Sequence, residues 1–266
     1  MFMKKLYLLL LLATGSLLAQ AQSKISAPTA LWPELQVSYG LGESGQLFLQ
    51  NQYRINTDRR YNDLKQSGFL SNFERIQLAV GYEHTFTERW RAGGLFRYAL
   101  EDFPETSFLT GYLRHTGSIK SLFFTKQLML EYIKQEERDA YGRGRLMAEL
   151  GKRLSLGSRF ITPSLSYELF VNSQLGQAAS DAEERTIDRT RLQLNFTYEL
   201  TEKLRINPYF LRQTDYYYVQ VPPKYDENEV LVEEGYITKR NRISPVIGLQ
   251  IKYTLNTLPV VGSYTY

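Results

Sequence analysis

Hydrophobic and polar residues alternate along most of this chain with a period of two. In the stretch "RLQLNFTYELTEKLRINPYF" (191–210), apolar residues occupy the even positions from 192 to 200, and polar or charged residues occupy the odd positions from 191 to 199. Side chains of a β-strand point alternately to its two sides, so this pattern predicts a strand with one apolar and one charged face. The residues Thr201-Glu202-Lys203 then predict a turn, after which the chain runs back.

Comparable patterns recur almost without interruption, which predicts a chain built from strands and turns. We expect strands over 32–40, 46–56, 70–86, 88–100, 106–116, 119–134, 141–155, 158–173, 187–200, 203–218 and 238–255. Short connections such as "TFTERW" alternate with longer or more charged ones at 57–69, 101–106, 135–141, 174–186 and 219–237. No linker or change in composition interrupts the series, which indicates one domain of tandem antiparallel hairpins.

Two of the expected hairpins resemble each other in sequence. Segment 75–91 begins with Arg-Ile-Gln-Leu and ends with Thr-Glu-Arg-Trp-Arg. Segment 191–205 begins with Arg-Leu-Gln-Leu and ends with Thr-Glu-Lys-Leu-Arg. The repeat predicts the same strand–turn–strand structure in both.

A long series of antiparallel strands must close on itself or leave exposed edges. Two closed forms fit the alternation. In a soluble lipocalin-like barrel the apolar face points inward, whereas in an outer-membrane barrel it points to lipid and the charged face lines the lumen. Alternation alone reports two faces without saying which of them is outside.

Three features favour the membrane form. A soluble barrel of about eight strands is just filled by its side chains, so a larger one would enclose an apolar cavity. Short turns alternating with longer loops are typical of outer-membrane barrels. The apolar stripes extend over about 10–13 residues, close to the 9–11 that a tilted strand needs to cross a bilayer. We therefore predict an all-β fold, a single antiparallel up-and-down transmembrane β-barrel.

Aromatic residues near the expected strand ends support this interpretation. The chain has 20 tyrosines and 14 phenylalanines. Tyrosine and tryptophan form girdles at membrane interfaces because the ring is apolar and its polar group needs water. We expect such girdles to include Trp32, Tyr39, Tyr53, Trp90, Tyr98, Tyr132, Tyr167, Tyr198, Tyr216–Tyr218 and Tyr253.

The number of strands is a separate question. The patterns suggest eleven strands, but bacterial single-chain barrels have even numbers. If the short turns share one end, the strand at Trp32 and the strand ending at Leu255 run in the same direction. We therefore expect 10 or 12 strands and favour 12, with segment 23–30 ("SKISAPTA") as an added strand in the opposite direction.

The N-terminus has the features of a secretory signal peptide. Lys4 and Lys5 precede the apolar run "LYLLLLLATGSLL", and Ala19-Gln20-Ala21 has the small residues of a cleavage site. A true N-terminal transmembrane helix is the alternative. We predict a signal peptide over 1–21, a barrel domain over 22–266, and export to the outer membrane of a Gram-negative bacterium. The chain has no cysteine, which excludes a lipid anchor on cysteine and disulfides.

Charge and hydropathy exclude several other classes of protein. Removing Lys4 and Lys5 from the 32 basic residues leaves 30 against 28 acidic residues, a balance unlike that of a nucleic-acid-binding protein. After the signal peptide, no apolar run reaches the length of about 18 residues that a membrane-spanning helix needs.

The polar faces carry many charges that we expect to point into the lumen. Buried charges must be paired, and a lumen with both signs allows pairing between strands. The expected cluster comprises Arg75, Glu83, Arg91, Arg97, Arg145, Glu149, Arg153, Glu168, Arg191, Glu199, Arg205, Arg242 and Lys252, and Arg54 and Glu131 share these faces. The cluster fits an interlocked plug that stabilises the barrel, and alternatively a narrow polar conduit for small solutes.

Candidate catalytic and metal-binding residues are few. The two histidines, His84 and His115, lie beside short turns, which we expect on the periplasmic side, away from an extracellular rim site. Acidic residues gather at 181–188 and 226–234 without the spacing of a calcium loop. No glycine-rich phosphate loop or nucleotide fingerprint occurs. We expect no enzymatic activity, metal or cofactor; a rim-site enzyme is the less favoured reading.

The last expected strand contains Gly248-x-x-Ile251-x-Tyr253, which is similar to the C-terminal signal that delivers barrels to the outer-membrane assembly machinery. We therefore expect that machinery as a partner during biogenesis. In the mature state we expect outer-membrane lipid and lipopolysaccharide as surroundings, and no nucleic acid.

The span from Trp32 to Tyr253 resembles the outer-membrane barrels grouped as domain of unknown function 2490, found largely in Bacteroidota. The resemblance rests on Trp32 and on the hairpins "YEHTFTERWRAGGLFRY" and "RLQLNFTYELTEKLRINPYFLR". It implies a barrel and an outer-membrane location, and it supplies no catalytic residue. Together with the residue patterns, it indicates a non-enzymatic structural or interaction barrel.

Overall fold

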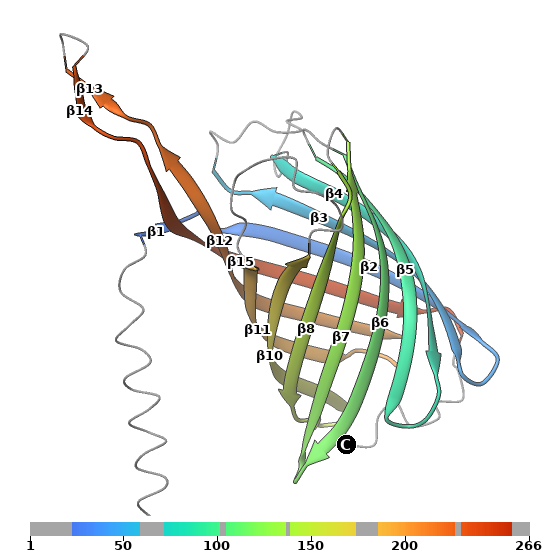
Figure 1. Ribbon diagram of the computed structural model, residues 1–266. Helices are drawn as coiled ribbons and strands as arrows, with labels where there is room; N and C mark the ends of the chain where they lie inside the picture. The colour runs from blue at the N-terminus through green and yellow to red at the C-terminus, as the bar shows by residue number, and fades with distance from the viewer. Residues whose placement is uncertain are drawn as a thin grey trace, which may run out of the picture.

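The chain folds into a β-barrel (Figure 1). The computed structural model describes residues 23–58, 72–101, 105–136, 139–173, 186–226 and 230–256; the predicted signal peptide over 1–21 and the tail after 256 lie outside these ranges. No helix within them has the length and apolar character needed to cross a membrane. The wall is formed by β2 (Ala30–Leu41), β3 (Gly45–Asn56), β4 (Phe73–Thr85), β5 (Trp90–Leu100), β6 (Thr106–Ile119), β7 (Leu122–Gln135), β8 (Tyr141–Gly151), β10 (Arg159–Ser173), β11 (Ile187–Glu199), β12 (Leu204–Val221) and β15 (Tyr236–Thr254).

The barrel closes with eleven strands, so the expectation of 10 or 12 is wrong. Ten of the pairings are antiparallel, and the eleventh joins β15 to β2 in parallel, from Val246 opposite Ala30 to Thr254 opposite Ser38. Both of these strands run toward the same end, as the sequence suggested. An even number is needed only if every pair is antiparallel, and one parallel pair removes that requirement.

The segment expected to add a strand in the opposite direction does not do so. Strand β1 (Ser23–Ser26) pairs in parallel with Arg240–Ile243 of β15. Strand β2 continues along the same edge of β15 after a short gap. Segment 23–30 therefore extends the closing pair and adds no position to the wall.

Short and long connections lie at opposite ends of the barrel, as predicted. Two of the short turns have only two residues, and the first residue of each has a positive φ: 57° at Lys120 and 61° at Gly157. Two-residue hairpin loops commonly use such left-handed conformations because they match the twist of the strands. The short strand β9 (Leu154–Leu156) continues β8 along β10 to this end. We call the two ends the short-turn end and the long-loop end.

The repeated hairpin motif produces the same turn twice. Between β4 and β5 the hydroxyl of Thr87 accepts hydrogen bonds from the backbone N–H groups of Arg89 and Trp90. Between β11 and β12 the hydroxyl of Thr201 accepts them from Lys203 and Leu204. A threonine hydroxyl that binds the backbone two and three residues on stabilises a tight turn, which explains why both copies have threonine there.

The hairpin of β12 and β15 projects beyond the wall at the long-loop end (Figure 1). At its tip β13 (Lys224–Tyr225) pairs with β14 (Leu231–Glu233) in a separate two-stranded sheet. Lys224 donates a hydrogen bond of 2.5 Å to Glu233, and this contact raises the pKa of the lysine. Apolar side chains are exposed here, among them Val232 at 68% and Ile237 at 62%.

The outer wall of the barrel is apolar and its inner wall is polar. In β11, Leu194 is 40% exposed and Phe196 41%, whereas Asn195 between them is 7% exposed. The same alternation on the other strands leaves leucine, valine and isoleucine side chains on the outer surface, such as Val80, Leu109, Leu130 and Ile247. This arrangement is the reverse of a lipocalin-like barrel, and it agrees with the orientation predicted for Leu194 and Asn195.

Aromatic rings inside the barrel cover glycines of neighbouring strands. A Cβ atom on any of these glycines would overlap the ring that lies over it, so the rings can pack against the wall only where a side chain is missing. The pairs are Phe48 over Gly81, Tyr112 over Gly93, Phe123 over Gly151 and Tyr209 over Gly248. These contacts fill part of the lumen with apolar atoms and fix the register of adjacent strands.

Candidate functional site

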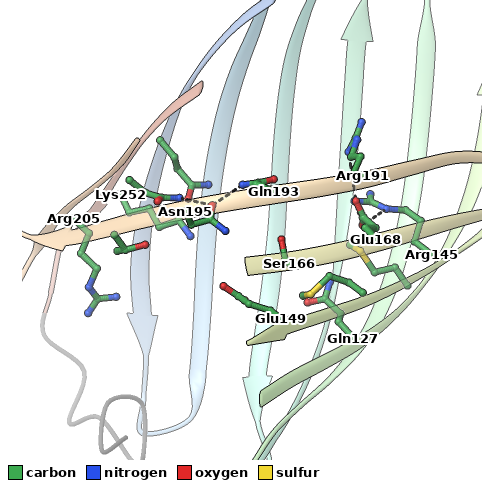
Figure 2. Close-up of a pocket in the computed structure, with 15 residues that line it drawn as sticks. Gln127, Arg145, Glu149, Ser166, Glu168, Arg191, Gln193, Asn195, Arg205 and Lys252 are labelled. Atoms are coloured by element: carbon green, nitrogen blue, oxygen red, sulfur yellow. Dashed lines mark hydrogen bonds and ion pairs between the residues drawn. The ribbon is translucent and has the colours of Figure 1, made fainter. Parts of the chain in front are cut away.

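The predicted lumen charges converge inside the barrel. Two cavities of about 320 and 450 Å³ occupy the lumen and share part of their walls; Figure 2 shows the smaller one. Nine of the thirteen residues predicted as a cluster line one or both cavities: Glu83, Arg91, Arg97, Arg145, Glu149, Glu168, Arg191, Arg205 and Lys252. Period-two alternation was sufficient to find them.

The other four residues of the predicted cluster lie near the two ends. Arg75 forms an ion pair with Glu101 at the long-loop end. Arg153 and Glu199 form a pair at 2.8 Å at the short-turn end. The prediction that Arg242 points into the lumen is wrong, because its side chain is exposed. Alternation along β15 puts Arg242 on the same side as the inward-pointing residues. However, it lies toward the projecting part of the hairpin, where fewer strands surround it.

Glu131 is the centre of the ion-pair network in the long-loop half of the lumen. Its side chain is 0% exposed. It receives the guanidinium groups of Arg97 at 2.5 Å, Arg143 at 2.7 Å and Arg145 at 2.9 Å. These residues come from β5, β7 and β8, so a single carboxylate ties three strands together. A fully buried carboxylate is tolerated here because its charge and lone pairs are matched.

The network continues from Arg145 around the wall. Arg145 also binds Glu168 of β10 at 2.6 Å, and Glu168 is 3.6 Å from Arg191 of β11 (Figure 2). Arg191 also donates a hydrogen bond of 3.0 Å to Gln213 of β12. Ion pairs and hydrogen bonds thus form a continuous path from β5 to β12 across the interior.

Two phenylalanine rings occupy the space between these arginines. Phe108 is 3% exposed, and the guanidinium carbon of Arg97 lies 4.3 Å from its ring centroid. Phe170 is 1% exposed, and Arg145 and Arg191 each lie 4.8 Å from its centroid. Such cation–π contacts strengthen when water is excluded. Stacked rings and arginines therefore occupy much of the long-loop half of the lumen, and the larger cavity extends to Arg54, Arg97 and Arg191 in the same half.

The short-turn half is polar and less crowded. Glu83 accepts a hydrogen bond from the hydroxyl of Tyr112 at 2.8 Å and forms an ion pair with Arg114 at 3.1 Å. Ser164 donates to Glu149 at 2.6 Å and accepts from Asn195 at 3.3 Å. Amide and hydroxyl groups thus lie among the basic residues of this half, which include Arg91, Arg114 and Arg205, and the cavities lie beside them.

The prediction that Trp32 belongs to an aromatic girdle is wrong, because its side chain lies inside the barrel. It is 5% exposed and packs with Ala30, Tyr209, Leu211 and Val246. Trp32 lies on the same side of β2 as Glu34 and Gln36, and all three residues line the larger cavity. Its closeness to the strand end suggested an interface position, but the side to which it points is fixed by alternation.

The histidines lie at the short-turn end, outside the lumen. His84 Nδ1 is 3.1 Å from the hydroxyl of Tyr82, and the ring of His115 packs edge-on against Trp90 with centroids 4.6 Å apart. Among the described residues, no three histidine or acidic side chains are grouped as a metal site would require. Of the acidic loop residues, Asp181, Glu183, Glu184, Glu227 and Glu229 lie outside the described ranges.

Several residues of the network were missed by the sequence reasoning. Arg143 binds Glu131, Glu101 binds Arg75, and Arg189 binds Asp215 at 2.5 Å. Arg143 and Arg189 lie two residues before Arg145 and Arg191, so they have the same parity and could have been found by extending the pattern. Glu101 follows the last residue of β5, where alternation gives no direction.

Comparison with protein families gives a match over most of the barrel. The family described as "Protein of unknown function (DUF2490)" matches residues 29–218. The matched part runs from the start of β2 almost to the end of β12 and includes the whole Glu131 network. Neither the comparison with curated proteins nor that with solved structures found a match.

Proposed function

This chain belongs to the DUF2490 family of proteins of unknown function, and we propose that it is an integral outer-membrane β-barrel with a structural or interaction role and no enzymatic activity. The proposal includes export by the signal peptide over 1–21 and insertion by the barrel assembly machinery. In the mature state the barrel is surrounded by outer-membrane lipid and lipopolysaccharide.

The observation that carries this proposal is the inverted distribution of polarity. Outward apolar side chains such as Leu109 and Leu130 are 60% and 63% exposed, while charged groups point into the interior. In water, such an outer wall would expose an apolar surface far larger than soluble monomers tolerate. In lipid, the same wall is favourable, and the polar lumen needs no contact with hydrocarbon.

A structural or interaction role is supported by how the lumen is filled. The network centred on Glu131 and the rings of Phe108 and Phe170 crosslink the wall and occupy its long-loop half. The projecting hairpin presents exposed apolar residues beyond the barrel. A filled lumen with a projecting surface fits a protein that contacts others better than one that conducts solutes.

A narrow channel for small polar solutes is the second candidate. The two lumen cavities favour it, because they are polar and together extend along much of the interior. The structural role and the channel role differ in whether the long-loop half of the lumen, where the arginines gather, opens to let solutes pass. They agree on the membrane location and on the orientation of the wall.

The location and orientation can be tested by cysteine labelling, since the native chain has no cysteine. Single-cysteine variants Leu194→Cys and Asn195→Cys should be expressed in a Gram-negative host and treated in isolated outer membranes. We expect the cysteine at 194 to react with a membrane-soluble maleimide and to resist a water-soluble one. The cysteine at 195 should show the opposite preference if the cavity beside it is hydrated.

Two outcomes would contradict the proposal. One is efficient labelling of the cysteine at 194 by the water-soluble reagent in intact membranes. The other is recovery of the mature chain as a soluble periplasmic protein instead of with the lipopolysaccharide fraction. Variants that assemble should retain the heat-dependent gel mobility of the parent barrel, which serves as the folding control.

A further inference from the structure

The walls of the lumen cavities carry an excess of positive charge. Eight arginine or lysine side chains line them, against four glutamates. All four glutamates are already engaged: Glu34 accepts hydrogen bonds from Gln52 and Gln250, Glu149 from Ser164, and Glu83 and Glu168 bind arginines. The excess therefore has no compensating carboxylate on the cavity walls.

Arg54 is the cavity-lining cation with the least compensation of its charge. Among the described residues, its guanidinium group forms no ion pair, and its Nε–H is buried without a hydrogen-bond acceptor. The charged groups that interact most strongly with it are Arg75, Arg191, Arg189 and Arg97, all of the same sign. A buried cation surrounded by like charges is costly unless an anion accompanies it.

Trp32 lies beside Arg54 and has an unused donor of its own. The guanidinium carbon of Arg54 is 4.2 Å from the centroid of the Trp32 ring, and that of Arg191 is 5.4 Å from it. The indole Nε1–H is buried and has no acceptor among the described residues. The ring face offsets part of the cationic charge, but it leaves both N–H groups without an oxygen partner.

The geometry points to a binding site for a small oxyanion at Arg54, Arg191 and Trp32. Arginine presents a planar fork of N–H groups that matches the paired oxygens of a phosphate or carboxylate group. Such an anion would neutralise part of the excess charge and accept hydrogen bonds from the Arg54 and Trp32 donors. The adjoining cavity of about 450 Å³ is in the size range of small-ligand sites. This inference goes beyond the proposed function, because it does not depend on lipid outside the barrel.

The site can be tested through the fluorescence of Trp32. The sequence has two tryptophans, and Trp90 lies at the short-turn end, so a Trp90→Phe barrel in detergent reports on Trp32 alone. Inorganic phosphate is titrated at constant ionic strength, with chloride as the balancing ion. We expect a saturable change in Trp32 emission. A parallel titration with acetate shows whether a carboxylate group is bound as well as a phosphate group.

The decisive comparison is between two arginine variants in the Trp90→Phe background. Arg54→Met should weaken phosphate binding by about tenfold or more, because a charge-assisted hydrogen bond is lost. Arg54→Lys, which keeps the charge but not the fork, should weaken it less. Arg153→Met is the matched control: Arg153 also points inward, but it pairs with Glu199 and lines neither cavity. Its affinity for phosphate should equal that of the parent.

Three results would overturn the inference. They are no saturable response to phosphate or acetate, an unchanged affinity in Arg54→Met, and an equal loss in Arg54→Met and Arg153→Met. The last would mean that only the total charge matters. Each variant is first checked for heat-dependent gel mobility, which shows that it has assembled. If Arg54→Met does not assemble, the phosphate affinities of Arg54→Lys and Trp32→Phe are measured by calorimetry. Affinities equal to that of the parent in both variants would then overturn the site.

Discussion

Arg97 of β5 donates a 2.5 Å hydrogen bond to Glu131 of β7, across the strand that lies between them. Glu131 also binds Arg143 and Arg145 of β8, so one buried carboxylate is surrounded by three positively charged side chains. Its carboxylate forms an ion pair with each of these three arginines.

Glu131→Gln should destabilise the barrel strongly. The amide keeps the size of the side chain but removes its charge, which leaves Arg97 and Arg143 without an anionic partner. Breaking a buried pair by changing one partner costs roughly 3–5 kcal/mol. The measurement is the temperature at which the folded gel band converts to the unfolded band. Glu199→Gln is the control, because Glu199 pairs with one arginine, Arg153, at a more exposed site, and its loss should be smaller.

Leu194→Arg should impair assembly more than Asn195→Arg. A charge on the lipid face near the middle of the bilayer costs about 2–4 kcal/mol, whereas Asn195 already lies among polar groups. The measurement is the amount of heat-modifiable barrel in the outer membrane at equal expression. Equal assembly of the two variants, or better assembly of Leu194→Arg, would count against a lipid-facing outer wall.

Gly248→Ala should destabilise the barrel, although it adds a single methyl group. The Cβ would overlap the ring of Tyr209, which lies over Gly248 from the neighbouring strand. Overpacking of this kind costs roughly 1–3 kcal/mol. Gly111→Ala is the matched control, since a Cβ there meets no atom within 4 Å. Similar melting temperatures for the two variants would mean that the ring can move aside.

Purified wild-type protein should give no conductance steps in planar bilayers. Phe108 and Phe170 fill the space between the arginines of the long-loop half, and the ion pairs hold these side chains in place. The double variant Phe108→Ala/Phe170→Ala should increase conductance, because it removes both rings from the interior. Regular steps with the wild-type protein would favour the narrow-channel candidate instead.

Removing the tip of the projecting hairpin should leave the barrel intact. Strands β13 and β14 pair only with each other and contact no wall strand. Replacing residues 222–235 with an Asn-Gly turn should therefore change neither the assembly nor the thermal conversion of the barrel. A loss of assembly would show that the tip is required for folding or insertion.

The sequence alone determined the strands and the two faces of the wall. Leu194 and Asn195 could be assigned to opposite faces because side-chain direction in a strand depends only on local backbone geometry. The same reasoning found nine cavity-lining charges, and the repeat at Thr87 and Thr201 predicted a shared turn, since both depend on contacts within a few residues.

The tertiary structure decided how the strands close and which charges meet. The parallel pairing of β15 with β2 joins segments about 200 residues apart, and no local pattern specifies it. Trp32 was expected at an interface, yet its ring lies inside the barrel near Arg54 of the adjacent strand β3 and near Arg191 of β11, which the curvature of the wall brings to the same place. Glu131 of β7 accepts a hydrogen bond from Arg97 of β5, although β6 lies between the two strands. Such contacts depend on register and closure, which are properties of the whole barrel and not of any one strand.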